Sequence, residues 1–268
     1  MTREMGTLGK EVAREFSRRQ GIGVIHHELI HSPHDRMAKN QESDVYRFLE
    51  GSEEELAKWR NNRAQDGYLT AEEIYELALE DNVLIRGWGA ARLLKSVPNI
   101  LSVRVCAPMD FRIAQMMERL GVGEREAQRE IERSDAAHSR TFLRFYETDW
   151  RDPLNYDLVL NTAHLSPTTC ADILVDAAAN PAFAGTEATR NELHDRLLEA
   201  RISTAINADA SLGRQAQHIQ IKIQDGDVRL YGVVTNGQSS QTAERIVAAQ
   251  NGVSSVHNEI ARINRFSN

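Results

Sequence analysis

The chain has 268 residues, of which 41% are hydrophobic, and a formal net charge of −7. This length and composition predict a soluble globule with one large domain, or with one medium and one small domain. General affinity for nucleic acid or anionic lipid needs a positive field, which this chain lacks. No apolar run reaches the roughly 18 residues of a membrane span, and the opening MTREMGTLGK lacks the apolar core of a secretory signal. We therefore expect a cytoplasmic protein without a nucleic-acid partner.

The first feature along the chain is the stretch TREMGTLGKEVAREF, in which Gly6, Gly9 and Lys10 lead into a helical pattern. A loop of this kind wraps the phosphates of a nucleotide when it follows a buried strand. Only Met1 to Arg3 precede it here, so either Met1 is not the natural start or the sheet lacks its middle strand. The alternative is an ordinary helix start with two glycines in front of it.

Apolar runs predict the strands of the first two thirds of the chain. They are GIGVI (21–25), NVLIR (82–86), LSVRVCA (101–107) and YDLVLN (156–161). Continuous apolar runs separated by helices are typical of a parallel sheet that is covered on both faces. We therefore expect an α/β fold.

Helices are predicted between these strands. The TAEE motif makes Thr70 the N-cap of a helix that runs to about residue 79, with Glu73 as its reciprocal partner. Apolar periodicity predicts a helix over residues 109–120 that Gly121 ends, and a helix over 166–179 with Ser166 as its N-cap and Pro167 at its first position. Residues 124–147 are expected to form one long arginine-rich helix or a pair of helices.

The pattern changes near residue 180. After NPAFAGTEATR it becomes helix, hairpin, helix and strand, with isoleucines alternating over 219–223 and the turn DGD at 225–227. A helix over about 239–249 and a strand over 256–263 follow. We expect a first domain over residues 1–180, a linker over 181–190 and a second domain over 191–268.

The last part of the chain resembles a BON domain, a small αββαβ module. The resemblance rests on DxxLxxxI, an IxIxIxDGxVxLxGxV hairpin and GVxxVxNxI within residues 191–264. It implies an interaction or anchoring module without catalytic residues. The expected partner is another protein or a second copy of the chain, which would make a homo-oligomer.

The first part resembles the cytidylate kinase-like family of nucleoside monophosphate kinases. The segments that carry this resemblance are REMGTLGKEVA, IHHELI, RGWGAARLL, VRVCAP followed by RI, SDAAHSRTFLRFY and DWRDPLNYDLVLNT. It implies a P-loop kinase-like parallel sheet with helices on both faces. It also implies transfer of phosphate from ATP, with Mg²⁺, to a pyrimidine nucleoside monophosphate such as CMP.

The resemblance implies three groups of site residues. The phosphates of the cofactor would be held by Gly6, Thr7, Gly9, Lys10 and Arg133. The catalytic residues would be Lys10, Asp135, Arg140 and Arg144. The nucleoside monophosphate would be bound by His26, Gly87, Trp88 and Gly89. No resident metal site is expected, because the histidines after residue 25 are read as scattered surface residues of a loop.

Several positions depart from the pattern of the family. Read as GxxxxGK[ST], the loop has Glu4 in place of the first glycine and Glu11 in place of the Mg²⁺-binding hydroxyl. A carboxylate beside triphosphate oxygens repels them unless a metal intervenes. Trp88 replaces an arginine between two glycines, His26 replaces an aspartate, and His138 replaces an arginine of the lid helix.

Three functions therefore stay open. The chain could be a monophosphate kinase that neutralises the moving phosphoryl group with arginines. It could be a nucleotide-binding pseudokinase whose BON domain reports to a partner. It could also be a structural subunit, in which the kinase-like domain keeps its fold without an activity and the BON domain drives self-association.

Overall fold

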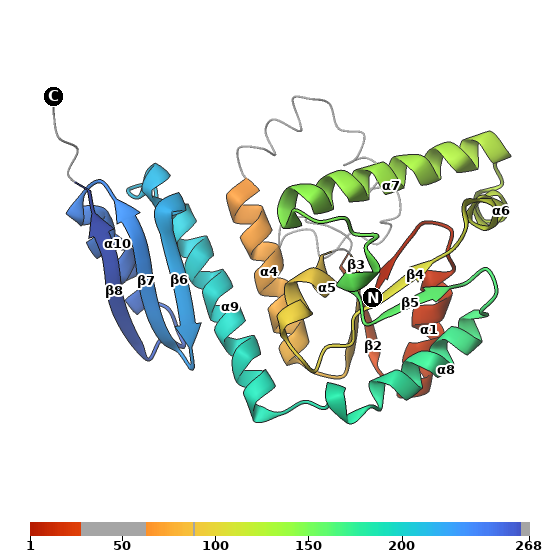
Figure 1. Ribbon diagram of the computed structural model, residues 1–268, viewed down its shortest axis with the longest axis horizontal. Helices are drawn as coiled ribbons and strands as arrows, with labels where there is room; N and C mark the ends of the chain where they lie inside the picture. Colours follow the sequence, from red (N-terminus) through yellow and green to blue (C-terminus); the bar gives the residue numbers. More distant parts are fainter. Residues whose placement is uncertain (28–62, 88, 264–268) are drawn as a thin grey trace. The chain divides into compact units, whose positions relative to one another are not determined.

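The computed structural model describes residues 1–27, 63–87 and 89–263 of the chain (Figure 1). These residues form two compact units. The first unit contains residues 1–27 and 80–186, apart from Trp88, and the second contains residues 63–79 and 187–263. Within the described residues, no helix is both long and apolar enough to cross a membrane.

The first unit is built on parallel strands, as the apolar runs predict. The strands are β1 (Thr2–Arg3), β2 (Gly23–His27), β3 (Val83–Gly87), β4 (Val103–Cys106) and β5 (Leu158–Asn161). Strand β2 pairs in parallel with β3, and β4 lies between β1 and β5 with both neighbours parallel to it.

The short strand β1 occupies the centre of this arrangement. The backbone nitrogen of Met1 donates to the carbonyl oxygen of Ile85 at 2.7 Å. The nitrogen of Gly87 donates to the carbonyl oxygen of Met1 at 3.1 Å. These two bonds join β3 to β1 and give the order β2-β3-β1-β4-β5. The expectation that the sheet lacks its middle strand is therefore wrong: two residues suffice, because their neighbours on both sides supply hydrogen-bond partners.

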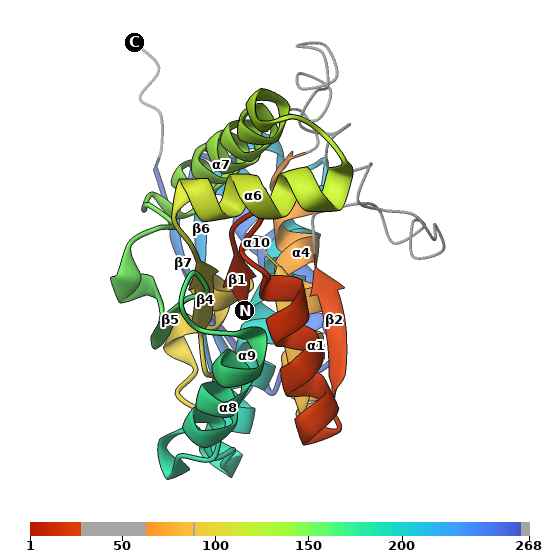
Figure 2. The same ribbon diagram turned by 90° about the vertical axis from the view of Figure 1, so that its right-hand side faces the viewer.

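Helices cover the sheet. They are α1 (Gly9–Gln20), α5 (Ala90–Leu93), α6 (Met109–Leu120), α7 (Glu124–Tyr146) and α8 (Pro167–Ala178). Helices α1 and α8 lie side by side (Figures 1 and 2) and pack on β4 and β5 through a cluster that includes Val12, Val105 and Leu174. This burial of apolar surface supplies most of the free energy that holds α1, and hence the loop before it, against the sheet.

Three of the predicted helices agree with the structure. Helix α6 has the predicted bounds and ends at Gly121, whose φ of 68° is left-handed. Helix α8 begins as predicted, with the side chain of Ser166 accepting a bond from the nitrogen of Thr169. The residues from 124 onward form one long helix, α7, rather than a pair.

The second unit contains the αββαβ order that the BON resemblance implies, together with one helix from earlier in the chain. Its elements are α4 (Arg63–Leu79), α9 (Glu187–Ala208), β6 (Ile219–Gln224), β7 (Asp227–Val234), α10 (Gly237–Ala248) and β8 (Ser255–Arg262). Strands β6 and β7 form the predicted antiparallel hairpin, and β8 pairs in parallel with β7. Helices α9 and α10 pack on one face of this sheet through buried residues that include Ile202, Leu230 and Val247.

Helix α4 packs along α9 and not on a sheet. The guanidinium of Arg201 on α9 donates to Glu72 at 2.9 Å and to Glu76 at 2.7 Å. The prediction that this helix begins with Thr70 as its N-cap is wrong, because the helix already includes Arg63. Local capping preference is worth about 1 kcal/mol, whereas packing against a helix far along the chain stabilises several turns.

Gly232 allows the hairpin to approach the chain just before β6. Its φ is 126°, and a Cβ atom there would lie 2.0 Å from the carbonyl oxygen of His218. Both the backbone conformation and the missing side chain are therefore required.

We predict that Gly232→Ala lowers the free energy of unfolding by about 2 kcal/mol or more, because the added methyl forces the hairpin away from His218. Gly237→Ala is the matched control, since a Cβ at the start of α10 meets no atom within 4 Å. Urea denaturation followed by circular dichroism measures both. Equal stability of the two variants would contradict this account of the hairpin.

Candidate functional site

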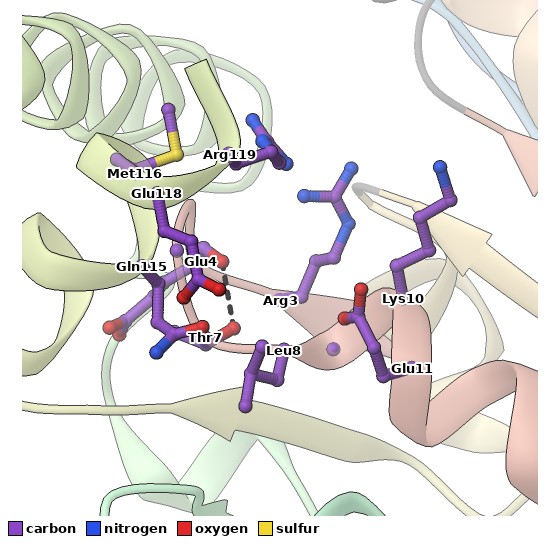
Figure 3. A pocket seen from close by; sticks show the side chains of 12 residues that line it. Arg3, Glu4, Thr7, Leu8, Lys10, Glu11, Gln115, Met116, Glu118 and Arg119 are labelled. Atoms are coloured by element: carbon purple, nitrogen blue, oxygen red, sulfur yellow. Dashed lines mark hydrogen bonds between the residues drawn. The ribbon is translucent and has the colours of Figure 1, made fainter. Parts of the chain in front are cut away.

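The loop between β1 and α1 is held by hydrogen bonds to its own backbone and to β4 and β5. The nitrogen of Glu4 donates to the carbonyl oxygen of Val105 at 3.2 Å. The buried hydroxyl of Thr7 donates back to the carbonyl oxygen of Glu4 at 2.8 Å (Figure 3). Thr162, just after β5, donates its hydroxyl to the carbonyl oxygen of Thr7 at 2.7 Å. The loop is therefore a fixed turn and not a flexible entry to the helix.

Gly6 is required by this turn. Its φ is 79°, and a Cβ atom there would lie 2.6 Å from the carbonyl oxygen of Arg112 on α6. Leu8 takes a left-handed conformation as well, with a φ of 55°, and is the N-cap of α1. Two left-handed residues so close together turn the backbone amides of the loop toward one side.

The amides at the start of α1 are available to a ligand. Within the part of the chain that the structure describes, the backbone nitrogens of Gly6, Leu8 and Gly9 donate to no protein acceptor. The first amides of a helix lack partners inside the helix and carry the positive end of its dipole. An anion beside this turn would therefore meet several donors and a favourable field.

A pocket of about 260 Å³ lies at this loop, between the start of α1 and helix α6. Figure 3 shows Arg3 and Lys10 extending on the same side of the loop, with Arg119 on the facing helix. Glu11 and Glu118 also line the pocket. The cations come from three different elements, and Glu4 is a third carboxylate in the lining, so the formal charges of the pocket balance.

Beneath the loop lies a cluster of buried charges, centred on Arg112. Its Nε donates to the carbonyl oxygen of Met5 at 2.7 Å, and its Nη1 lies 3.4 Å from Glu4 Oε2. Its two terminal nitrogens also donate to both carboxylate oxygens of Asp135, at 2.9 and 2.7 Å. The Glu4 carboxylate accepts a further bond from Arg104 on β4.

This cluster gives Glu4 a role that the sequence does not suggest. Only 7% of its side chain is exposed, and two guanidinium groups neutralise it. The carboxylate at the position of the first glycine is thus paired inside the protein, which removes most of the repulsion expected toward a phosphate.

The residues of α7 that were expected to form the catalytic lid differ in their burial and in their partners. Asp135 faces inward to Arg112. Arg133 is half exposed and lies 3.2 Å from Glu130, and Arg140 is exposed. Arg144 lies on the same helix, with its side chain outside the described residues. Asp135, Arg133 and Arg140 do not line the pocket at the loop.

His138 is a core residue. It is 7% exposed and meets the ring of Trp150 edge to face, with 5.0 Å between the ring centroids. Burial, aided by the positive charges of Arg3 and Arg112, holds the pKa of His138 well below its ordinary value. The imidazole is therefore neutral near pH 7 and supplies no positive charge where an arginine is typical.

The residues expected to bind the acceptor nucleotide lie at the ends of β2 and β3. His26 pairs in register with Arg86, and its side chain lies outside the described residues. Gly87 ends β3, Trp88 lies outside the described residues, and Gly89 is the left-handed N-cap of α5. The structure thus brings Gly6, Thr7, Gly9 and Lys10 around one pocket, which Gly87 and Gly89 do not line.

Sequence reasoning missed the contribution of α6. Arg112 and Met116 are four residues apart on the buried face of that helix. A charged residue on an otherwise apolar helix face signals a buried ion pair. That signal could have identified Arg112 as a partner of an acidic residue, but not which one.

A parallel sheet with helices on both faces, whose first strand leads through a glycine-containing turn to a helix N-terminus, defines an α/β protein of the phosphate-loop class. A model of the cytidylate kinase-like family matches residues 1–164, so the chain belongs to that family. A model of the BON domain matches residues 194–263.

Cytidylate kinases of two archaea are similar to part of this chain. The one from Sulfolobus acidocaldarius is 34% identical over 96 residues, which are 36% of this chain and 52% of the relative. The one from Sulfurisphaera tokodaii is 31% identical over 103 residues, 38% of this chain and 57% of the relative. The chain thus spans about half the length of the curated relatives it matches.

A solved structure shares the fold. It is an uncharacterized protein from Eubacterium ventriosum, 22% identical, with a TM-score of 0.51, and the match covers 66% of this chain and 94% of that protein.

We predict that Arg112→Met lowers the free energy of unfolding by about 3–5 kcal/mol, because it leaves the carboxylates of Glu4 and Asp135 facing each other without their shared cation. Arg125→Met, at an exposed position of α7, should change it by less than about 0.5 kcal/mol. Chemical denaturation measures both. A cost for Arg112→Met no larger than that of the control would show that the cluster does not hold the loop.

We predict that His138 lowers stability in acid. The unfolded chain takes up a proton near the ordinary pKa of 6.5, whereas the folded chain does so only at lower pH. Stability is thus retained above pH 6.5 and falls as the pH drops below it. When the pH falls from about 7.5 to about 5.5, the free energy of unfolding of His138→Phe should decrease by about 1 kcal/mol less than that of the native chain.

Urea titrations at the two pH values provide the measurement. His164→Gln, at an exposed histidine, should keep the native pH dependence. If the free energy of unfolding changed equally with pH in His138→Phe and in the native chain, the imidazole would be protonated in the folded state, which would contradict the prediction.

Proposed function

We propose that this chain binds the phosphates of ATP at the loop of residues 3–11 and transfers the terminal phosphate to a pyrimidine nucleoside monophosphate such as CMP. The observation that carries the proposal is the set of loop amides without protein acceptors beside a pocket that Arg3, Lys10 and Arg119 line. In this proposal the BON domain, over residues 191–268, contacts a protein partner and takes no part in the chemistry.

The binding half of this proposal rests on charge and on rigidity. Amide donors and the lysine neutralise the donor phosphates, which is the main requirement of phosphoryl transfer besides positioning. The turn is held by Thr7, Thr162 and Arg112, so its donors are in place before a ligand arrives. Preorganised donors cost no rearrangement on binding.

The residues at the loop are compatible with Mg²⁺. Glu11 is exposed in the first turn of α1 and lines the pocket. Carboxylates and phosphate oxygens are ligands that Mg²⁺ prefers. Glu11 would hold the metal in place of a hydroxyl, and the metal would neutralise negative charge on the phosphates. Nucleotide binding should therefore depend on Mg²⁺ more strongly than in a site with a hydroxyl.

A second candidate, a nucleotide-binding pseudokinase, is favoured by α7. His138 is buried and neutral, and Asp135 is engaged by Arg112. Of the arginines expected to neutralise a moving phosphoryl group, Arg133 and Arg140 have described side chains, and neither lines the pocket. Binding would then persist while transfer is slow or absent.

Melting temperatures with ATP, with and without Mg²⁺, test the binding half of the proposal. Saturating Mg²⁺ and ATP should raise the melting temperature by several degrees. Lys10→Met should remove most of this rise, because Lys10 lines the pocket. Arg14→Met is the matched control, since Arg14 lies one turn further along α1 and does not line it.

Formation of ADP and CDP from ATP and CMP tests the transfer half. Arg140→Ala should keep the ATP-dependent rise in melting temperature and lose about a hundredfold in rate. A rise in melting temperature without turnover in the native chain would support the pseudokinase instead. No rise with any nucleotide would overturn both candidates.

A further inference from the structure

Strand β8 forms one edge of the sheet in the second unit. The strand order is β6-β7-β8, and β7 is the neighbour of β8 over its whole length (Figure 1). Among the residues that the structure describes, no strand pairs with the outer side of β8. A strand of 8 residues with an open side is a template for another strand.

The backbone of β8 alternates between its two sides. The nitrogen of Ile263 donates to the carbonyl oxygen of Val234 at 3.0 Å, so the odd-numbered residues direct their backbone groups to β7. Even-numbered residues direct theirs to the open side. The nitrogen of Ile260 agrees with this, because it bonds to the side-chain oxygen of Asn258 at 3.2 Å and not to β7.

The side chains of β8 alternate as well. Val256 and Ile260 are partly buried and pack against the core with the helices. His257 and Glu259 point to the opposite face, where both are exposed. Within the described residues, Glu259 has no ion-pair partner. A basic and an acidic side chain thus lie two residues apart on the uncovered face, and His257 Nε2 also lies 3.1 Å from Asp227 Oδ1.

We propose that β8 is the interface of a symmetric dimer, in which a second copy of the chain pairs antiparallel with it about a two-fold axis at Asn258. In this register Val256 faces Ile260 of the second copy, and His257 faces Glu259 of the second copy. The two sheets would become one sheet of six strands. Such an interface is self-complementary, as a two-fold axis requires.

The backbone fits this register. Residues that face each other across the axis are both even-numbered or both odd-numbered. The even-numbered residues, whose amides and carbonyls are directed outward, would form the hydrogen-bonded pairs. His257 and Glu259 would form the non-hydrogen-bonded pairs, where opposite side chains come closest.

The charges select this register from its neighbours. A shift of the axis to residue 259 would set two glutamates against each other, and a shift to residue 257 would set two histidines together. With the axis at Asn258, Glu259 of the second copy extends a row of basic side chains. Strand pairing places Lys222 beside Arg229, and Arg229 beside His257.

Asn258 makes the association reversible. Its side-chain nitrogen donates to the carbonyl oxygen of Ser240 at 3.2 Å and to the carboxylate of Glu244 at 2.8 Å. Its side-chain oxygen accepts a hydrogen bond from the backbone nitrogen of Ile260. On pairing, the nitrogen of Ile260 would exchange this acceptor for the carbonyl of Val256 in the second copy. The dimer therefore loses this one bond within the chain and gains the hydrogen bonds between the two strands. In the monomer, the nitrogen of Ile260 keeps an acceptor.

Sedimentation equilibrium of the full chain over about 1–100 µM tests the proposal. The native chain should associate reversibly to a dimer. Glu259→Lys alone, or His257→Glu alone, should weaken association about tenfold or more, because symmetry replaces two pairs of a basic and an acidic side chain with two pairs of basic or two pairs of acidic side chains. An equal mixture of the two variants should recover association, since each supplies the charge that the other lacks.

Two controls accompany this experiment. Gln220→Lys adds a charge to the same face on β6, away from the interface, and should leave association unchanged. Circular dichroism should show that every variant is folded. A native chain that stays monomeric over the whole range, single variants with unchanged association, or a mixture that recovers nothing would each overturn the proposal.

Discussion

The guanidinium of Arg112 is the group on which the phosphate-loop region depends. It bonds to the backbone of the loop at Met5, lies against Glu4, and binds both oxygens of Asp135 on α7. Three segments far apart in the chain therefore meet at one side chain. Because an unpaired charge at a buried position is far more costly than a lost surface pair, these segments can only be displaced together.

Much of the fold could be predicted from the sequence, because it is specified by local patterns. The apolar runs that became β2 to β5 are continuous and separated by helices, and they predicted a parallel sheet. The alternation over 219–234 and its DGD turn gave the hairpin of β6 and β7. Ser166 and Gly121 marked helix ends because each supplies the backbone contact that the end needs.

What the sequence could not specify depends on contacts between distant residues. Strand β1 has two residues, too few for any periodicity, and exists because β3 and β4 bond to it on both sides. Helix α4 runs past Thr70 because it packs on α9, more than a hundred residues later. The pairing of Glu4 with Arg104 and Arg112 likewise requires strand order to be known before the charges can be matched. Thus the loop residues of the candidate site were found from the sequence, and their supports were not.

The arrangement separates the binding of phosphates from their transfer. The loop is ordered by Arg112 and Thr162, which do not line the pocket, and by the buried hydroxyl of Thr7, which bonds back to the backbone of Glu4. Asp135 on α7 also helps to hold the loop in place, because it binds the guanidinium of Arg112. A histidine stands at position 138 of α7, where an arginine is typical of the family; it is buried against Trp150 and leaves these bonds in place. A chain built in this way can lose the cations that speed the transfer of a phosphoryl group and still keep a fixed turn whose backbone amides can bind the phosphates of a nucleotide.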